Sequence, residues 1–437
     1  MSTAIAHPTP AARSRAIAAR AVAALRTETG LARVALGAVA LHTVDDAFLQ
    51  PNPGTSAGDH LAGGLIPTTL LLATAWAYPR LRAGLRAALV FVFGFFALLS
   101  SVEGIYYSRE VGPSGDDYTG LLALPAAFVL IGVGAVALWK SRRTDDPLWW
   151  RYPRRLLVTA GALLAASVVA VPLTVSYVVT HVARAEVPTA DLGAPYENVE
   201  FQTSDGLRLK GWYIESRNGA AVISFPGRAS SQKRAKMLAD HGYGVLLFDR
   251  RGEGESEGDP NLFGWQGERD VHAAVKFLQT RPDVDPERIG GIGLSVGGEM
   301  MIEAAAESNA LKAIVSEGAS GRSVSDDFAN GGIKWQDKLG DAIATVGTAL
   351  STSNMPPEDL KGLVPKIGNR PVFFIYGERG QLAEKPANTG FYAEVRGPKE
   401  IWEVPGSKHM GGIDAQPRAY EQRVVGFFDR ELLKRSR

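Results

Sequence analysis

Residues 289–301 read IGGIGLSVGGEMM, and this stretch decides how the second half of the chain folds. The run before Ser295 is glycine-rich and apolar and follows an Asp-Pro turn, as a buried strand does. The run after it, VGGEMMIEAAAES, has the composition and length of a helix. We therefore predict that Ser295 lies on a sharp turn between a strand and a helix, where Gly293 and Gly297 relieve the crowding.

The same alternation of strand and helix extends over residues 196–437. Short apolar runs bounded by turn residues alternate with helical segments, which is typical of an α/β domain with a mostly parallel sheet covered on both faces. We expect eight strands, at 198–203, 207–214, 220–225, 244–249, 288–294, 311–316, 371–376 and 399–404. We expect helices near 230–241, 266–280, 296–308, 386–395 and 417–434.

A serine at such a turn becomes a nucleophile only if a base removes its proton. Of the seven histidines, His409 alone follows Ser295, and the chain order of nucleophile, acid and histidine is the one that this kind of turn predicts. A tetrahedral oxyanion would also need two backbone donors, and the N–H of Val296 at the start of the helix is one candidate. We therefore predict Ser295 as the nucleophile and His409 as the general base.

Composition excludes several other functions. The chain has no cysteine, which rules out disulfides, zinc–thiolate sites and cysteine catalysis. Its net charge of +1 and the lack of a basic stripe argue against nucleic acid as a partner.

Three motifs in order along the chain resemble those of the α/β-hydrolase superfamily, over roughly residues 196–435. They are GLSVG around Ser295, GYGVLLFDRRGEGESEG with Asp249, and FGWQGERDVHAAVKFL with Asp270. The closest resemblance is to the serine aminopeptidase and dienelactone-hydrolase branches. It implies an α/β-hydrolase fold, a Ser-His-acid triad, a small-molecule acyl substrate, and no metal or organic cofactor.

The resemblance also implies a second oxyanion donor. In the turn VISFPGRASS the superfamily usually has His-Gly, and this chain has Pro226-Gly227. The donor implied by this position is the N–H of Arg228.

The acid of the triad is where the chain departs from the superfamily pattern. The usual aspartate position falls on Gly380, so another carboxylate has to orient the histidine. Glu384 is the first choice, because it begins the next helix and matches a glutamate of the similar proteins that precedes a tryptophan by 18 residues. Glu317, after the sixth strand, and Glu378, near the usual position, are the alternatives.

Residues 319–368, between the sixth and seventh strands, form an insertion. In this fold such an insertion covers the pocket and sets substrate choice. Because it is short and carries Trp335 on a modestly apolar helix, we expect a small cap over a small or medium acyl group.

The first half of the chain is predicted to be a membrane region. Five apolar segments have lengths close to the roughly 20 residues that cross a bilayer, namely 31–49, 61–78, 87–107, 118–139 and 156–179. Residues 1–30 would then be a cytoplasmic segment and 180–195 a linker to the α/β domain. The spans imply the lipid bilayer as a partner.

Lysine and arginine in the short loops predict the orientation, because they accumulate on the cytoplasmic side. One side would carry Arg13, Arg15, Arg20, Arg26, Arg80, Arg82, Arg86, Lys140, Arg142, Arg143, Arg151, Arg154 and Arg155, and the other only Arg109 and Arg184. We therefore expect a multi-pass protein of the cytoplasmic membrane, with a cytoplasmic N-terminus and an extracytoplasmic α/β domain.

Polar residues inside the spans leave a different function open. His42, Asp45 and Asp46 share one face of the first segment, and Glu103 lies at a similar depth in the third. Such groups could form a proton or metal site, or they could lie at the headgroup level in contact with water. Two alternatives to a hydrolase follow: a membrane-region activity such as transport, and a non-catalytic sensing or binding module on the hydrolase fold.

Overall fold

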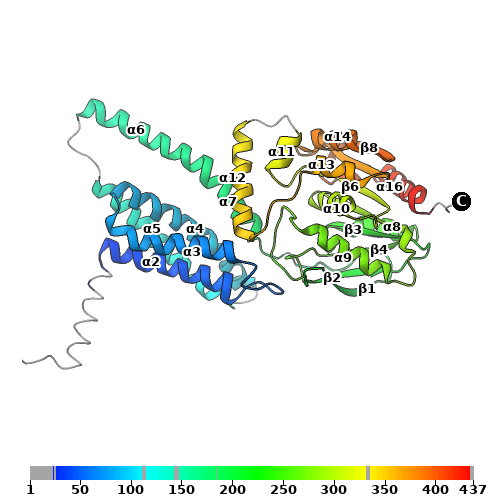
Figure 1. The fold of residues 1–437 in the computed structure, drawn as a ribbon, viewed down its shortest axis with the longest axis horizontal. Coiled ribbons are helices and arrows are strands. Elements are labelled where there is room, and N and C mark those ends of the chain that lie inside the picture. The colour runs from blue at the N-terminus through cyan, green and yellow to red at the C-terminus, as the bar shows by residue number, and fades with distance from the viewer. Residues whose placement is uncertain are drawn as a thin grey trace, which may run out of the picture. The chain divides into compact units, whose positions relative to one another are not determined.

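A computed structural model describes residues 23, 26–110, 115–141, 147–184, 186–330 and 335–433. The chain divides into two compact units, one formed by Met1–Pro51 and Ser56–Leu164 and the other by Asn52–Thr55 and Ala165–Arg437 (Figure 1). Most of the predicted cytoplasmic segment, including Arg13, Arg15 and Arg20, lies outside the described residues.

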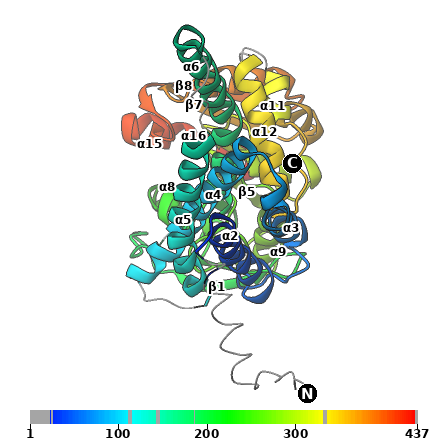
Figure 2. The ribbon, with the colours of Figure 1, turned by 90° about the vertical axis from the view of Figure 1, so that its left-hand side faces the viewer.

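The first unit consists of helices that pack on one another. They are α2 (Glu28–Val44), a π-helical turn η1 (Asp45–Leu49), α3 (Leu61–Ala77), α4 (Ala83–Glu110), α5 (Asp117–Ser141) and α6 (Leu148–Ala165). Helices α2 to α5 lie side by side (Figures 1 and 2) and bury a shared apolar core that includes Leu36, Val39, Leu71, Val90 and Leu130.

Three described segments are long and apolar enough to cross a membrane, namely Leu61–Arg80, Ala83–Arg109 and Asp117–Lys140. They coincide with the second, third and fourth of the five expected spans, so five clear spans are not supported. In the first segment the α-helix ends after 17 residues at Val44 and continues as a π-turn through two aspartates. In the fifth, charged residues occupy the first half of α6, which leaves Val168–Thr180 as a shorter apolar helix.

The second unit is built on an eight-stranded sheet in the order β1-β2-β4-β3-β5-β6-β7-β8. Strands β1 and β2 are antiparallel to their neighbours, and β3 to β8 are parallel. All eight expected strands are present. Their bounds are β1 Glu197–Gln202, β2 Arg208–Ile214, β3 Ala221–Phe225, β4 Gly244–Phe248, β5 Ile289–Leu294, β6 Ala313–Glu317, β7 Val372–Arg379 and β8 Lys399–Lys408.

Helices cover both faces of this sheet, which explains why the central strands are apolar on both sides. The five helices predicted from the sequence are α8 (Arg228–Asp240), α9 (Gly267–Gln279), α10 (Val296–Glu307), α14 (Glu384–Glu394) and α16 (Pro417–Leu432). One core cluster joins α9, α10 and α14 to the sheet, and a second joins α8 and α16 to the opposite face. Because β5 to β8 run parallel, the carboxyl ends of β5, β7 and β8 lie at the same edge of the sheet.

The insertion between β6 and β7 is helical. Its helices are α11 (Val324–Asn330), α12 (Trp335–Thr352) and α13 (Leu360–Leu363), and residues 331–334 lie outside the described residues. Within the same compact unit, α12 packs along α7 (Val171–Thr180), which follows α6 through the π-turn η3 (Ala166–Ala170).

Candidate active site

Ser295 occupies a strained turn between β5 and α10. Its backbone has φ 51° and ψ −124°, a conformation that non-glycine residues rarely adopt and that functional sites often retain. Its backbone N–H donates to the carbonyl oxygen of Glu317 over 2.7 Å, which fixes the turn to the neighbouring strand. The turn thus places the serine hydroxyl at the carboxyl edge of the sheet.

Two glycines make this turn possible. A Cβ atom at Gly293 would lie 2.5 Å from the carbonyl carbon of Gly297, and one at Gly297 would lie 2.5 Å from Cδ of Pro226. Side chains do not tolerate such distances, so the glycine-serine-glycine spacing is a steric requirement of this turn. The prediction that both glycines relieve crowding is confirmed.

His409 lies next to the serine hydroxyl. It follows β8, and its Nε2 atom is 2.9 Å from Oγ of Ser295. The ring also lies against Gly318, where a Cβ atom would be 3.1 Å from Cε1 of His409. Gly318 has φ 78°, so this residue both makes the turn after β6 and leaves room for the imidazole.

Glu384 completes a chain of hydrogen bonds from the serine. Its Oε1 atom is 2.5 Å from Nδ1 of His409 and accepts the backbone N–H of Gln381 over 2.7 Å. Burial would raise the pKa of this carboxyl, but the hydrogen bonds from His409 and the backbone outweigh it and hold the pKa below its usual value. Glu384 is therefore a buried, ionised carboxylate aimed at the histidine.

The position of Glu384 also explains the glycine at 380. A Cβ atom at Gly380 would lie 2.6 Å from Cδ and 2.7 Å from Oε1 of Glu384. The carboxylate thus occupies the space into which an aspartate at 380 would project. Compared with the usual aspartate position of the superfamily, the acid thus lies four residues later in the chain but at nearly the same place beside the imidazole.

The two alternative glutamates lie in other surroundings. Glu317 is buried and accepts hydrogen bonds from Arg234 at 2.7 Å, from the Tyr420 hydroxyl at 2.6 Å and from the Gly412 N–H at 2.9 Å. Glu378 is exposed and accepts the N–H of Gly406. Of the three candidates, the structure brings Glu384 to the histidine, and Glu317 instead ties α8, the loop after β8 and α16 together.

The two expected oxyanion donors differ in their surroundings. Val296 is the first residue of α10, where a helix leaves its N–H groups without intrahelical partners. The N–H of Arg228, the first residue of α8, instead donates to Oδ1 of Asp249 over 2.9 Å. The Arg228 guanidinium also pairs with Asp249, so this carboxylate holds both the backbone and the side chain. An oxyanion at this site would have to take the Arg228 N–H from Asp249.

A buried carboxyl that the sequence analysis did not single out lies one helical turn after the serine. Oε1 of Glu299 accepts the backbone N–H groups of Ser320 and Gly321, at 2.8 and 3.0 Å. Burial raises its pKa to about 7. The sequence signal was an acidic residue within the apolar helix VGGEMMIEAAA, which indicates a buried carboxyl with a specific partner. Glu299 thus fixes the first residues of the cap to the helix that carries the serine turn.

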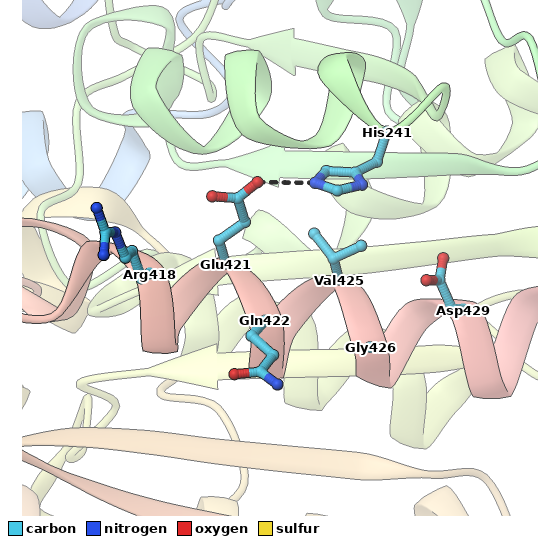
Figure 3. Close-up of a pocket in the computed structure, with 7 residues that line it drawn as sticks. All are labelled: His241, Arg418, Glu421, Gln422, Val425, Gly426 and Asp429. Atoms are coloured by element: carbon cyan, nitrogen blue, oxygen red, sulfur yellow. Dashed lines mark hydrogen bonds and ion pairs between the residues drawn. The ribbon is translucent and has the colours of Figure 1, made fainter.

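A shallow surface pocket of about 340 Å³ lies on α16 (Figure 3). Its lining includes His241 and Glu421, which form a hydrogen bond of 2.8 Å, and it contains none of Ser295, His409 and Glu384. Because this pocket holds no nucleophile, it does not extend the candidate site.

The polar residues of the first apolar segment form a small network in the first unit. The hydroxyl of Thr119 is 3.2 Å from Nδ1 of His42 and donates to Oδ2 of Asp45 over 2.7 Å. Asp45 also accepts from Gln50. Across the residues that the structure describes, no group of three or more His, Cys, Asp or Glu side chains could hold a metal ion. The metal alternative for His42, Asp45 and Asp46 therefore has no support from the geometry.

Comparison with known proteins agrees with the topology of the second unit. Residues 182–366 match the sequence profile of the family described as X-Pro dipeptidyl-peptidase (S15 family). The second unit has the α/β-hydrolase fold. Its relatives include the uncharacterized protein YfhR of Escherichia coli, which is 24% identical over 248 residues, covering 53% of this chain and 80% of that protein.

Other relatives carry enzymatic names. The thiohydrolase aneE of Aspergillus aculeatus is 37% identical over 129 residues, which is 28% of this chain and 41% of that protein. Among solved structures, an esterase of Pyrococcus furiosus is 26% identical and covers 57% of this chain and 97% of its own, with a TM-score of 0.47. The match to this family profile indicates that the second unit is an enzyme of the serine hydrolase type.

Proposed function

We propose that this chain is a membrane-anchored serine hydrolase that cleaves an ester, thioester or amide bond through an acyl-enzyme. The observation that carries the proposal is the continuous path from Oγ of Ser295 to Nε2 of His409 at 2.9 Å and from Nδ1 of His409 to Glu384 at 2.5 Å. A serine, an imidazole and a buried carboxylate in this order are the groups that acyl transfer needs.

The proposed reaction has two halves. In the first, Nε2 of His409 accepts the proton of Ser295 as Oγ attacks the carbonyl carbon, and the imidazolium then protonates the leaving group. Glu384 keeps the Nδ1–H tautomer in place and stabilises the imidazolium. In the second half, His409 removes a proton from water as the water oxygen attacks the acyl carbon, and the imidazolium then returns this proton to Oγ of Ser295 as the carboxylic acid product leaves. No metal or organic cofactor takes part in these steps.

The oxyanion would be stabilised by backbone donors at the start of α10 and α8. Val296 N–H lies at the positive end of α10, and the second donor would be Arg228 N–H after its exchange from Asp249 to the substrate oxygen. Loss of one such donor typically lowers kcat by a factor of about 10² to 10³, which corresponds to about 2.7 to 4 kcal/mol of transition-state stabilisation.

The proposed substrate is a small acyl compound, and the names of the relatives suggest which bonds to test first. The matched family is described as a dipeptidyl-peptidase, and the relatives include a thiohydrolase and an esterase. A panel of aminoacyl-proline amides, thioesters and short-chain esters therefore covers the three bond types.

Anchoring is supported by the three long apolar helices. We propose that α2 with η1, and the apolar part of α6, η3 and α7, cross the membrane as well, which gives five spans in the cytoplasmic membrane. The arginines and lysines that flank α3 to α6 favour a cytoplasmic N-terminus and an extracytoplasmic hydrolase domain. Accessibility of single engineered cysteines to a membrane-impermeant maleimide in intact cells tests this orientation, because the chain has no cysteine of its own.

Labelling with a fluorophosphonate tests the catalytic proposal. The full-length protein in detergent should be labelled, and Ser295→Ala should abolish labelling while leaving the unfolding temperature within a few degrees of that of the parent protein. The matched control is Ser204→Ala, in the exposed turn between β1 and β2, which should label normally. A folded parent protein that resists labelling and hydrolyses no member of the panel would contradict the proposal.

One observation favours a second candidate, a non-catalytic binding module. The pairing of the Arg228 N–H with Asp249 leaves a site with one ready oxyanion donor, which would stabilise a tetrahedral intermediate poorly. A folded protein that binds acyl compounds in calorimetry but turns none over would support this module.

A further inference from the structure

The cap helix α12 carries a narrow apolar stripe on its exposed side. Trp335, Leu339, Val346 and Leu350 are 71%, 43%, 58% and 42% exposed. At about 100° per residue these four positions fall within about 60° of one another around the helix. Phe328 on the neighbouring helix α11 is 64% exposed as well. The four exposed apolar residues of α12 are thus gathered on one line of this helix.

The second half of the stripe, Val346 and Leu350, lies on a part of the helix without charge. From Ala342 to Thr352 the sequence is AIATVGTALST, which contains no acidic or basic residue. A helix that faces water normally carries charged residues opposite its buried face. The outer face of α12 therefore has the composition of a helix that contacts an apolar phase.

The opposite face of α12 is fastened to α7. Oγ of Ser176 donates to the carbonyl oxygen of Ala344 over 2.8 Å. A Cβ atom at Gly347 would lie 2.9 Å from Cβ of Ser176, so only glycine permits this approach. Small residues that let two backbones approach closely are typical of helix pairs in membranes. The cap helix thus packs closely against α7.

Helix α7 is itself part of an apolar segment, Val168–Thr180. Val171, Val175 and Val178 are 58%, 42% and 49% exposed and recur at spacings of four and three, so they share one side of α7. Two packed helices in the same compact unit therefore both expose apolar residues. Because α7 and α12 pack together, whatever apolar phase covers the exposed valines of α7 would also cover the stripe on α12.

We propose that the stripe of α12 docks on the bilayer in which the chain is anchored, at the boundary between lipid headgroups and acyl chains. Trp335 is of the residue type that lies at this boundary, and the uncharged part of α12 would face the acyl chains. The cap of the hydrolase domain then rests on lipid instead of facing water. The proposal rests on the proposed membrane anchoring and not on the role of Ser295.

Single cysteines carrying an environment-sensitive nitrobenzoxadiazole label test the docking. The absence of native cysteine confines the label to the chosen site in the full-length protein, reconstituted into vesicles of phosphatidylcholine and phosphatidylglycerol. Val346→Cys reports on the stripe, and Leu350→Cys repeats the measurement if the first variant does not fold. Val92→Cys on α4 is the control inside a proposed span, and Gln279→Cys at the exposed end of α9 is the control in water.

We expect nitroxide-bearing lipid to quench the label at 346 at least half as strongly as the label at 92, with little effect at 279. Iodide in the water should quench 279 several-fold more than 346. If the labels at 346 and 279 respond alike, or if 346 is shielded from both quenchers by protein, docking on lipid is refuted while quenching at 92 keeps the anchoring intact. A label at 92 that lipid fails to quench would overturn the anchoring and the docking together.

Discussion

Moving the triad acid back to the usual position is the sharpest test of the active-site geometry. Glu384→Ala removes a carboxylate that is 1% exposed and 2.5 Å from Nδ1 of His409, so the variant takes away the hydrogen-bond partner of Nδ1. We expect kcat/KM to fall by about 10³ to 10⁴, which corresponds to about 4 to 5.5 kcal/mol of lost transition-state stabilisation. The remaining activity would come from the serine and histidine with the backbone donors.

Adding Gly380→Asp to this variant should restore activity. The Cβ position at 380 lies 2.7 Å from where Oε1 of Glu384 was, and the carboxylate oxygens of an aspartate extend two bonds beyond its Cβ. We expect the double variant to recover at least tenfold over Glu384→Ala. In the parent chain, Gly380→Ala should instead lower activity, because its methyl group overlaps the Glu384 carboxylate.

Hydrolysis of p-nitrophenyl acetate, corrected for the rate of Ser295→Ala, measures these effects. Glu378→Ala is the matched control, because this glutamate is exposed and contacts Gly406 in β8 and not the histidine. Its activity should stay within twofold. The reasoning is refuted if Glu384→Ala keeps more than a tenth of the activity. It is also refuted if the folded double variant is no better than the single one.

Three further substitutions test other parts of the unit. Glu317→Ala should lower the unfolding free energy by about 3 to 5 kcal/mol, because it removes the carboxylate that pairs with the buried Arg234. The fraction that still folds should remain reactive toward fluorophosphonate. A stable but unreactive variant would contradict this prediction. Burial raises the pKa of Glu299 from 4.5 to about 7, so its stabilising contribution is present below pH 4.5 and is lost as the pH rises to about 7. Glu299→Gln should therefore match the parent near pH 4.5 and exceed it by about 3 kcal/mol at pH 8 in chemical unfolding, and an equal effect at both pH values would argue against it. Gly347→Leu should lower unfolding free energy by about 1 to 3 kcal/mol by overlapping Ser176. The atom nearest to an added Cβ at Gly340 is 3.7 Å away, so Gly340→Ala should instead raise it by up to about 1 kcal/mol, because alanine favours a helix more than glycine does.

The α/β architecture could be predicted because its signals are local. Each strand combines apolar residues with a bounding turn, and the bounds of all eight strands agree with the expected ones to within a few residues. The turn at Ser295 was predictable for the same reason, since Gly293 and Gly297 lie within two positions of it. The membrane segments were harder, because their number depends on where an apolar run becomes a continuous helix.

The acid and the oxyanion turn depend on contacts between distant segments. Glu384 could be favoured over Glu317 only by resemblance, because its distance to His409 is set by where α14 begins relative to β8. The engagement of the Arg228 N–H with Asp249 joins the ends of β3 and β4, and no spacing along the chain encodes it. The buried position of Glu317 among Arg234 and Tyr420 was likewise invisible in the sequence.

The packing of α12 on α7 has a practical consequence for preparing a soluble version of this enzyme. Cutting the chain just before β1, at the apparent start of the α/β domain, would remove α7 and lay bare the glycine- and alanine-lined side of α12. Such a truncated protein would be prone to aggregate or to lose its cap, and its poor behaviour could be misread as absence of catalysis. Beginning near Ala165 and replacing the outward valines of α7 by polar residues would retain the native support of the cap.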